Sequence, residues 1–419
     1  MSKPTAVLFL CANTAADALG GLGRAFRNSF ERLGHTFVEI NFARPDAIDA
    51  LNRTIKELPI EMVFTFIGMG VELPATTSEG KDINLWEGLR VPVISLYGDS
   101  PAYYFDRHVM PGRMFACLYG FPEHYSLRTR LPHIRGLLGT IPSIALDPVP
   151  KSEIDFSTKE RGRILFLKNG NDPQELIVMW RHALPDSLFV MITDMASELV
   201  RDMEETLGTD IDGLVTAFFL DKGLDIEWHP TLRLFFLAQL DDYLRRVKST
   251  MIAESLLDFP IEIHGDKWQH VNFNGRKATL VSGGDYAKSK KLIKNALALL
   301  DMSPNTGLAP HDRPLRAMGM YTLCLTNEQK YFNERFSNYQ AFSFHFEKES
   351  LQSKIADVIA HPRRYVELGC DVAEVFRKDQ DPDALARHLL DVASCLRLGS
   401  SQRMQGQQDY FAWPPEKLR

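Results

Sequence analysis

Short apolar runs alternate with longer segments of helical apolar spacing, and this alternation constrains the fold more than any other feature of the chain. Such alternation is typical of βαβ units, in which helices join parallel strands and cover the sheet. The first predicted strand, residues 6–11 (AVLFLC), leads through a glycine-rich loop into a predicted helix at 22–33. Further strands of the first half are predicted at 37–40, 62–67, 93–96, 114–118 and 143–145.

A second series of the same kind follows residues 147–161 (DPVPKSEIDFSTKER), whose prolines and charges are typical of an interdomain linker. It begins with a predicted strand at 163–167 and is interrupted by a mainly helical insertion at about 196–257. Further strands are predicted at 188–192, 261–264, 278–281, 297–302, 321–325 and 341–344, and closing helices at 350–360, 363–376 and 383–396. The fold class is therefore α/β, with two doubly wound, Rossmann-like domains whose strand ends would border ligand sites.

The predicted boundaries are 1–150 for the first domain, 151–398 for the second and 399–419 for a tail. We expect this tail to pack back on the first domain through Tyr410, Phe411 and Trp413. Docking of a partner and contact with a membrane surface are alternatives, although the tail lacks the basic amphipathic helix typical of membrane contact.

Composition and charge exclude several classes of protein. A hydrophobic content of 45% and a charged content of 24% are those of an ordinary globular protein. The net charge of −6 argues against a general nucleic-acid binder. No apolar run approaches the roughly 20 residues of a transmembrane span, and the amino-terminal segment lacks a secretory pattern. The five scattered cysteines form no CxxC pair, so we expect a cytoplasmic protein without a disulfide framework.

Four segments of the second half, in order, resemble the C-terminal domain of GT-B glycosyltransferases, most closely the CgeB-like (spore-maturation type) family. They are RILFLKNGNDP (163–173), FPIEIHGDKWQ (259–269), GGDYAKSKKLIKNALALLDMSPN (283–305) and HDRPLRAMGMYTLCLTNE (311–328). The last overlays the family pattern R-x-F-E-A-M-A-C-G. In the first half, VPVISLYGDSP (91–101) resembles the family's strand that leads into an Asp-Ser turn.

The resemblance implies a GT-B fold, in which two Rossmann-like domains face each other across a central cleft. The first domain would be the acceptor side and the second the nucleotide-sugar side. The implied activity is a hexosyltransferase-type transfer from a nucleotide-diphosphate sugar to a glycan or protein acceptor. The nucleotide sugar is then a substrate, and no cofactor is expected.

Two positions depart from the family pattern. Arg316 stands where the family usually has Glu, and Tyr321 replaces the usual Gly. That Glu is associated in the family with holding the donor ribose, and a cation cannot accept hydrogen bonds from hydroxyl groups. Either the donor is held differently or the domain has moved away from the usual nucleotide sugar. A non-catalytic GT-B-like binding or scaffold protein of glycan assembly and a nucleotide-sugar epimerase stay open as alternatives.

The segment at 303–319 (SPNTGLAPHDRPLRAMG) enters a predicted helix near His311. A helix N-terminus favours anions, and Arg313 would clamp a phosphate with two N–H groups. The alternative makes Asp312 an ordinary N-cap and Arg313 a solvated charge. The candidate donor contacts of this segment are Asn305, Thr306, His311, Asp312 and Arg313.

Other candidate donor contacts follow predicted strands. Lys168 and Asn169 stand after the strand at 163–167, where a lysine would add a second phosphate cation. Gly265 would let the backbone approach a ligand closely, and Trp268 would stack on a base or ribose. Tyr286, in GGDYAKSKK, is placed near the nucleotide. Each of these residues also has a purely structural interpretation. Trp268 would pack in the core, Tyr286 would cap a helix or lie on the surface, and Lys168 would simply be exposed.

An inverting transferase needs a general base near the acceptor hydroxyl. Asp17 lies in the glycine-rich loop, which does not match G-x-G-x-x-G, and Asp99 follows a predicted strand. Asp99 is alternatively a turn residue before Pro101. His108 is a further candidate base, as is His124.

No metal site is predicted. The D-x-D triplet DID at 210–212 lies inside the helical insertion. We therefore expect a metal-independent reaction, in which arginine, lysine and a helix dipole stabilise the charge of the leaving group.

Overall fold

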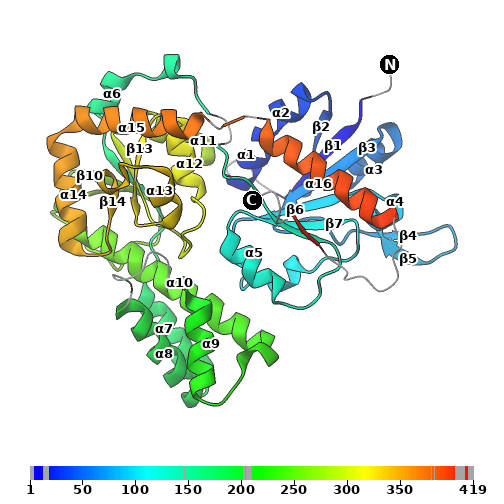
Figure 1. Cartoon of the computed structure of the whole chain (residues 1–419), viewed down its shortest axis with the longest axis horizontal. Coiled ribbons are helices and arrows are strands. Elements are labelled where there is room, and N and C mark those ends of the chain that lie inside the picture. Colours follow the sequence, from blue (N-terminus) through cyan, green and yellow to red (C-terminus); the bar gives the residue numbers. More distant parts are fainter. Residues whose placement is uncertain are drawn as a thin grey trace. The chain divides into compact units, whose positions relative to one another are not determined.

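The computed structural model describes residues 4–12, 18–145, 148–201, 203, 210–378, 380–381, 383–401 and 411–413. The chain forms two compact units, drawn in Figure 1. The first unit comprises Met1–Leu146 together with Asp381–Arg419, and the second comprises Asp147–Gln380.

The first unit is built on a parallel sheet with the strand order β15-β8-β7-β6-β3-β1-β2. Its strands are β1 (Ala6–Cys11), β2 (Thr36–Asn41), β3 (Ile60–Phe66), β6 (Val93–Tyr97), β7 (Phe115–Tyr119), β8 (Leu137–Thr140) and β15 (Phe411–Trp413). Since β2 and β3 flank β1 on opposite sides, the winding of the chain reverses at β1 and β3. Such a switch point opens a crevice at the carboxyl ends of the strands.

Both faces of this sheet are buried. Val7 and Phe9 of β1 contribute to one hydrophobic cluster, whereas Ala6 and Leu8 contribute to the other. Alternate strand residues point to opposite faces, so a strand covered on both sides is apolar throughout. The helices of this unit are α1 (Ala18–Ala25), α2 (Arg27–Arg32), α3 (Ala47–Glu57), α4 (Leu85–Leu89), α5 (Pro122–Thr129) and α16 (Ala384–Ser401), with a short hairpin of β4 (Pro74–Thr76) and β5 (Asp82–Asn84).

Helix α16 belongs to the first unit, although the sequence-based boundary assigned residues up to 398 to the second domain. Its Leu389 and Val392 are fully buried in the cluster that contains Phe9. Arg397 forms an ion pair with Glu61 of β3. The helix therefore covers one face of the first sheet, as Figure 1 shows for the orange-red helix at the end of the chain. Strand β15 then pairs with β8 at the edge of that sheet.

The second unit has a parallel sheet with the order β11-β10-β9-β12-β13-β14. Its strands are β9 (Ile164–Leu167), β10 (Ile261–His264), β11 (Thr279–Val281), β12 (Ala298–Asp301), β13 (Leu323–Asn327) and β14 (Ser343–Phe344). Counted within the unit, this is the order 3-2-1-4-5-6 of the Rossmann fold. The winding reverses between β9 and β12, which are paired neighbours.

Two predicted strands are wrong. Residues 188–192 lie inside α8 (Asp186–Arg201), where Ile192, Ala196 and Leu199 share a buried face at helical spacing. A short apolar run therefore belongs to a longer amphipathic helix. Residues 143–145 have no regular structure, and β8 at 137–140 supplies the strand instead.

The insertion of the second unit, drawn in green in Figure 1, is helical in its described residues. It contains α7 (Pro173–Ala183), α8, α9 (Ile211–Asp221) and α10 (Pro230–Ser255), so the insertion begins earlier than the predicted residue 196. The remaining helices of the unit are α6 (Phe156–Glu160), α11 (Tyr286–Asn295), α12 (Asp312–Gly319), α13 (Lys330–Arg335), α14 (Lys348–Ala360) and α15 (Pro362–Arg377).

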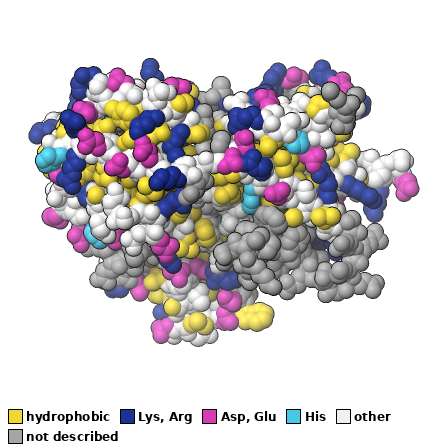
Figure 2. Space-filling model, turned by 45° about the horizontal axis from the view of Figure 1, so that its top comes forward, with side chains coloured by type: hydrophobic (Ala, Val, Ile, Leu, Met, Phe, Trp, Pro, Cys, Tyr) yellow, Lys and Arg dark blue, Asp and Glu magenta, His cyan; other side chains and the backbone are white. Residues whose placement is uncertain are grey.

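Charged side chains of both signs are interspersed on the face drawn in Figure 2. This mixture agrees with a composition of 48 basic and 54 acidic residues. In the described part of the chain, no helix combines the length and the apolarity that a membrane crossing requires.

Candidate functional site

A pocket of about 490 Å³ lies at the switch point of the second sheet, beside the carboxyl end of β9. Open α/β sheets bind ligands at this place. Its walls are formed by the end of β9 and the loop after it, the end of β10, the glycine pair before α11 together with α11 itself, and the first turns of α12. Its lining residues are Leu167, Lys168, Asn169, Asn171, His264, Gly283, Gly284, Ser289, Leu292, His311, Asp312, Arg313 and Arg316.

Five of the predicted donor contacts line this one pocket although they come from two segments far apart in sequence. Lys168 and Asn169 follow β9 directly, so the parallel strand delivers them to its carboxyl edge. The other three, His311, Asp312 and Arg313, lie at the start of α12, which begins at Asp312, close to the start predicted near His311.

The first turn of α12 is held to the sheet by one ion pair and one hydrogen bond of Arg313. Arg313 Nε lies 2.7 Å from Asp301 Oδ1, at the end of β12, and Arg313 Nη1 donates to the carbonyl of Leu167. Asp301 is fully buried, and the Arg313 side chain is only 13% exposed. Arg313 thus connects α12 to the ends of β9 and β12. Its Nε is paired with Asp301, and its Nη1 is bonded to Leu167.

His311 occupies the N-cap position of α12, and its Nδ1 contacts the Asp312 carboxylate. Burial alone would favour the protonated acid at Asp312. The neighbouring His311, Arg313 and Arg316 nevertheless hold the pKa of this carboxyl well below its usual value. Asp312 is therefore ionised throughout the physiological range and partly balances the cations of the pocket.

The charge of Lys168 depends strongly on its surroundings. Burial, followed by the charges of Arg313 and Arg245, lowers the pKa of Lys168 to about 8. An anion in the pocket would stabilise the charged amine and reverse this shift. The site therefore carries a positive group that gains from a phosphate.

Arg316, one helical turn after Arg313 on α12, also lines the pocket. Its Nη2 donates to Ser289 Oγ at 2.6 Å, and its guanidinium stacks at 4.3 Å from the centre of the Tyr286 ring. The side chain is 8% exposed. Tyr286 itself is not a lining residue, so its connection to the pocket runs through Arg316.

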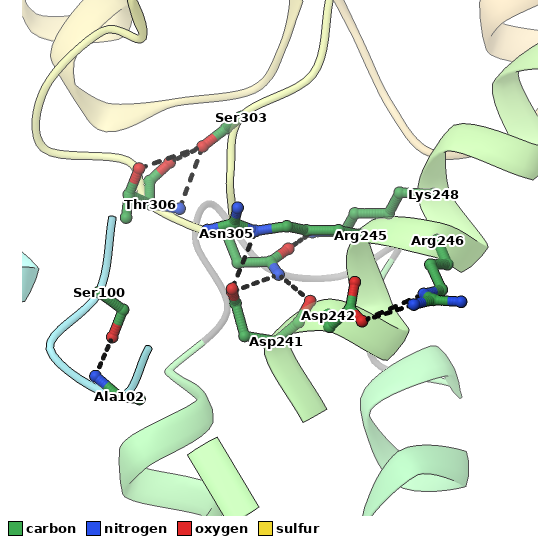
Figure 3. A network of polar contacts seen from close by, with 10 residues as sticks. All are labelled: Ser100, Ala102, Asp241, Asp242, Arg245, Arg246, Lys248, Ser303, Asn305 and Thr306. Atoms are coloured by element: carbon green, nitrogen blue, oxygen red, sulfur yellow. Dashed lines mark hydrogen bonds and ion pairs between the residues drawn. The ribbon is translucent and has the colours of Figure 1, made fainter. Parts of the chain in front are cut away.

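Asn305 and Thr306 do not line the pocket, in contrast to the prediction. Figure 3 shows Asn305 turned toward α10, where its amide donates to Asp241 Oδ1 at 2.8 Å and its Oδ1 accepts from Lys248 at 2.9 Å. The buried Thr306 donates its backbone N–H to Ser303 Oγ. Their polar groups thus stabilise the loop after β12.

Gly265 and Trp268 are structural as well. A Cβ atom at Gly265 would lie 2.1 Å from the carbonyl oxygen of Lys168, so the close approach is to the protein backbone. Trp268 is 2% exposed, and its Nε1 donates to that same carbonyl at 3.0 Å. The ring also packs against Gly170. Both residues position the loop that carries Lys168.

Sequence reasoning did not single out His264, Ser289 or the glycine pair at 283–284 as pocket residues. His264 is the last residue of β10 and contacts Glu262 Oε2 at 3.0 Å. Its place at the carboxyl end of a predicted strand was the available signal. For Ser289, the signal was its helical spacing from Tyr286.

The candidate bases belong to the first unit. Asp17 lies outside the described residues. Asp99 is exposed just beyond the carboxyl end of β6, and Ser100 next to it accepts from the N–H of Ala102. His108 is buried, and burial followed by the charge of Arg128 lowers its pKa to about 3, which leaves it a weak base.

A smaller cavity of about 80 Å³ marks the switch point of the first sheet. It lies at the ends of β1 and β3, where Ile67 adopts φ = 54°. A β-branched residue rarely adopts a positive φ. Arg107 brings a cation to this cavity.

No group of three or more His, Cys, Asp or Glu side chains within the described ranges is arranged to hold a metal ion.

Comparison with known proteins agrees with this architecture. Residues 245–391 match the sequence model of a family described as Glycosyl transferase-like. The match runs from α10 to α16 and thus includes β10, β12 and α12. No curated protein sequence is detectably similar to the chain.

Among solved structures, the chain is similar to the DNA-modifying enzyme β-glucosyltransferase, whose structure was determined with and without its substrate uridine diphosphoglucose. The likeness has a TM-score of 0.51 at 9% identity and covers 93% of this chain and 100% of the enzyme. A glycosyltransferase from Rickettsia africae matches with a TM-score of 0.34 at 12% identity, over 94% of this chain and 99% of that one. The first likeness is close enough to show a shared fold, and the second is not. The chain therefore has the GT-B fold predicted from its sequence, with two parallel α/β sheets.

Proposed function

We propose that the protein is a glycosyltransferase that transfers a sugar from a nucleotide-diphosphate sugar to a glycan or protein acceptor. The pocket at the β9–β12 switch point would hold the donor. The observation that carries this proposal is the convergence of Lys168, Arg313 and Arg316 with the N-terminus of α12 around one cavity of about 490 Å³. Its volume lies within the usual range for small-molecule sites.

The chemistry of the pocket suits a diphosphate leaving group. Glycosyl transfer breaks the bond between the anomeric carbon and the diphosphate, so negative charge grows on the phosphate oxygens. Lys168 and the first-turn N–H groups of α12 would stabilise that charge, with Asn169 and His311 as hydrogen-bonding neighbours. No metal ion enters this proposal.

Asp99 and Asp17 are our proposed general bases for the acceptor hydroxyl. Asp99 is exposed, so its carboxylate is accessible to a bound alcohol and would accept its proton. Replacing Asp99 by Asn would lower the transfer rate without changing nucleotide affinity.

Isothermal titration with nucleotides tests the donor site. Uridine diphosphate heads the panel because the similar β-glucosyltransferase uses uridine diphosphoglucose. ADP, GDP, CMP and dTDP complete it. We expect one nucleotide of this panel to bind the wild-type protein with a Kd in the micromolar range. The same nucleotide should bind the Lys168→Met variant at least about tenfold more weakly. Failure of every nucleotide to bind would remove the donor site and with it the proposed activity.

The same pocket would also serve a nucleotide-sugar epimerase or a non-catalytic binding protein. Product analysis separates the three functions. Incubation with a radiolabelled nucleotide sugar gives free nucleoside diphosphate and a labelled acceptor for a transferase, an isomeric nucleotide sugar for an epimerase, and unchanged donor for a binding protein.

A further inference from the structure

Arg316 is a buried cation that the protein itself satisfies only in part. Its Nε is buried and has no hydrogen-bond partner among the described residues. Its Nη1 lies 3.8 Å from Asp312 Oδ2, which is too long for a hydrogen bond. The other oxygen of that carboxylate is engaged by His311. Among the residues that the structure describes, the neutral hydroxyl of Ser289 supplies the one close hydrogen-bond partner, at 2.6 Å.

The guanidinium is nevertheless held in a fixed orientation. The Tyr286 ring lies against its face, and Ser289 fixes one edge. Both residues belong to α11, whereas Arg316 comes from α12. A preoriented guanidinium loses little freedom when a planar or tetrahedral anion binds it.

Arg316 has different partners from Arg313, although the two residues are one helical turn apart on α12. Arg313 turns toward β9 and β12 through Leu167 and Asp301, while Arg316 turns toward α11. The pocket therefore has one cationic side at the sheet and another at α11. A diphosphate on the first side leaves the second available for a different group.

We propose that Arg316 selects a donor that carries a second anionic group besides its diphosphate. That group would be a carboxylate on the transferred sugar or a phosphate on the ribose, since both match the fork of a guanidinium. A buried charge with an unsatisfied donor gains more from an anion than from a neutral hydroxyl. This inference rests on the proposed donor site and names the class of donor.

Two matched ligand pairs test the inference by isothermal titration on the full chain. The first pair is UDP-glucuronate and UDP-glucose, which differ only in a carboxylate on the sugar. The second pair is 2′-phosphoadenosine 5′-diphosphate and ADP, which differ only in a ribose phosphate. We expect the charged member of one pair to bind at least about tenfold more tightly, and the pair that shows this preference identifies the position of the anion.

The variant Arg316→Gln should bind both members of that pair with about equal affinity. Its affinity for the neutral member should differ little from that of the wild-type protein. Lys291→Gln is the matched control, because it removes an exposed cation of α11 outside the pocket, and it should keep the full preference. Thermal unfolding establishes that Arg316→Gln is folded. Ser289→Ala, which keeps the cation but loosens its orientation, should weaken the preference in part.

Several outcomes would overturn the inference. Equal affinities within both pairs would refute the second anionic group while leaving the donor site in place. An equal loss for charged and neutral members in Arg316→Gln would assign Arg316 to the diphosphate or to packing. If Arg316→Gln does not fold, an undiminished preference in Ser289→Ala contradicts the role given to Arg316. Binding of none of the four compounds would overturn both this inference and the proposed function.

Discussion

In the proposed donor site, the binding of a phosphate would depend on the protonation of one amine, that of Lys168. Burial and the neighbouring arginines bring its pKa to about 8, so at neutral pH most molecules carry the charge and at higher pH they lose it. A bound anion would favour the charged form. The affinity for a diphosphate must therefore depend on pH just above neutrality.

We predict that the affinity for a nucleotide sugar is fully present below pH 8 and falls as the pH rises through about 8. The sign follows from the lowered pKa, because deprotonation removes the positive charge. Titration calorimetry with UDP-glucose measures it, since a phosphodiester linkage does not itself titrate in this range.

Two variants separate Lys168 from other titrating groups. Lys168→Arg keeps its charge at every accessible pH and should bind with little pH dependence. Lys168→Met should bind weakly at every pH. A wild-type affinity that stays constant through mildly alkaline pH would contradict the assignment of Lys168 to the phosphate.

Arg313 contributes to the stability of the fold, and this contribution must be separated experimentally from any role in ligand binding. Its partner Asp301 is fully buried at the end of β12, with Arg313 Nε at 2.7 Å. Removing one member of a buried ion pair leaves the other charge uncompensated and costs about 3–5 kcal/mol. A simple loss of activity in an Arg313 variant would therefore be ambiguous.

We predict that Arg313→Met lowers the free energy of unfolding by about 3–5 kcal/mol and that Arg313→Met with Asp301→Leu recovers most of the loss. Denaturant unfolding measures both. The folded double variant then reports on binding alone, and we expect it to bind UDP-glucose at least about tenfold more weakly. A single variant as stable as the wild type would show that the pair contributes nothing to the fold.

At the scale of elements, the position of Lys168 depends on contact between two loops. The loop after β9 is held against the end of β10 by Gly265 and by the indole N–H of Trp268. The backbone of Lys168 therefore lies where no side chain would fit. Gly265 was predicted from the sequence to let the backbone approach a ligand. In the structure it lets two backbone segments of the protein approach each other.

Gly265→Ala should lower the free energy of unfolding by about 1–3 kcal/mol, because the new Cβ would meet the Lys168 carbonyl at 2.1 Å. Nucleotide affinity should fall as well, since the loop that carries Lys168 must shift. Gly98→Ala is a suitable control, because its Cβ meets nothing within 4 Å. Equal stability of the two variants in denaturant unfolding would contradict the contact.

The sequence predicted the elements of the site better than their contacts. The strand before Lys168 and the start of α12 follow from local patterns, namely an apolar run and an entry of Pro, His and Asp into a helix. Asn305 could not be assigned in this way, because its partners Asp241 and Lys248 lie about 60 residues earlier on α10. Arg316 stood out only as a departure from a family pattern, and its contact with Ser289 of α11 could not be read from local sequence.

At the scale of the whole molecule, helix α16, near the C-terminus, belongs to the same unit as the N-terminal strands. Helix α16 supplies fully buried residues to the core of the first unit, and Arg32 of α2 pairs with Asp383. Sequence patterns predict that such a helix exists but not which sheet it covers, because its apolar stripe would suit either. The first unit is therefore complete only after the second has been synthesised.

Leu389→Ala should destabilise the first unit by about 2–5 kcal/mol, since Leu389 is fully buried in its core. Leu398→Ala on the same helix should change stability by less than about 0.5 kcal/mol, because Leu398 is 65% exposed. Unfolding followed by hydrogen exchange would localise the loss to β1 and its neighbours. A loss confined to the second sheet would contradict the assignment of α16.

The central claim is that a nucleotide diphosphate binds at the switch point of the second sheet. A crystal structure of the protein with its tightest-binding nucleotide sugar tests this claim most directly. We predict phosphate oxygens within hydrogen-bonding distance of Lys168 Nζ and of the N–H groups that open α12. Density for the nucleotide in the cavity beside Ile67, or elsewhere on the surface, with the pocket of Lys168 and Arg313 empty, would contradict the account.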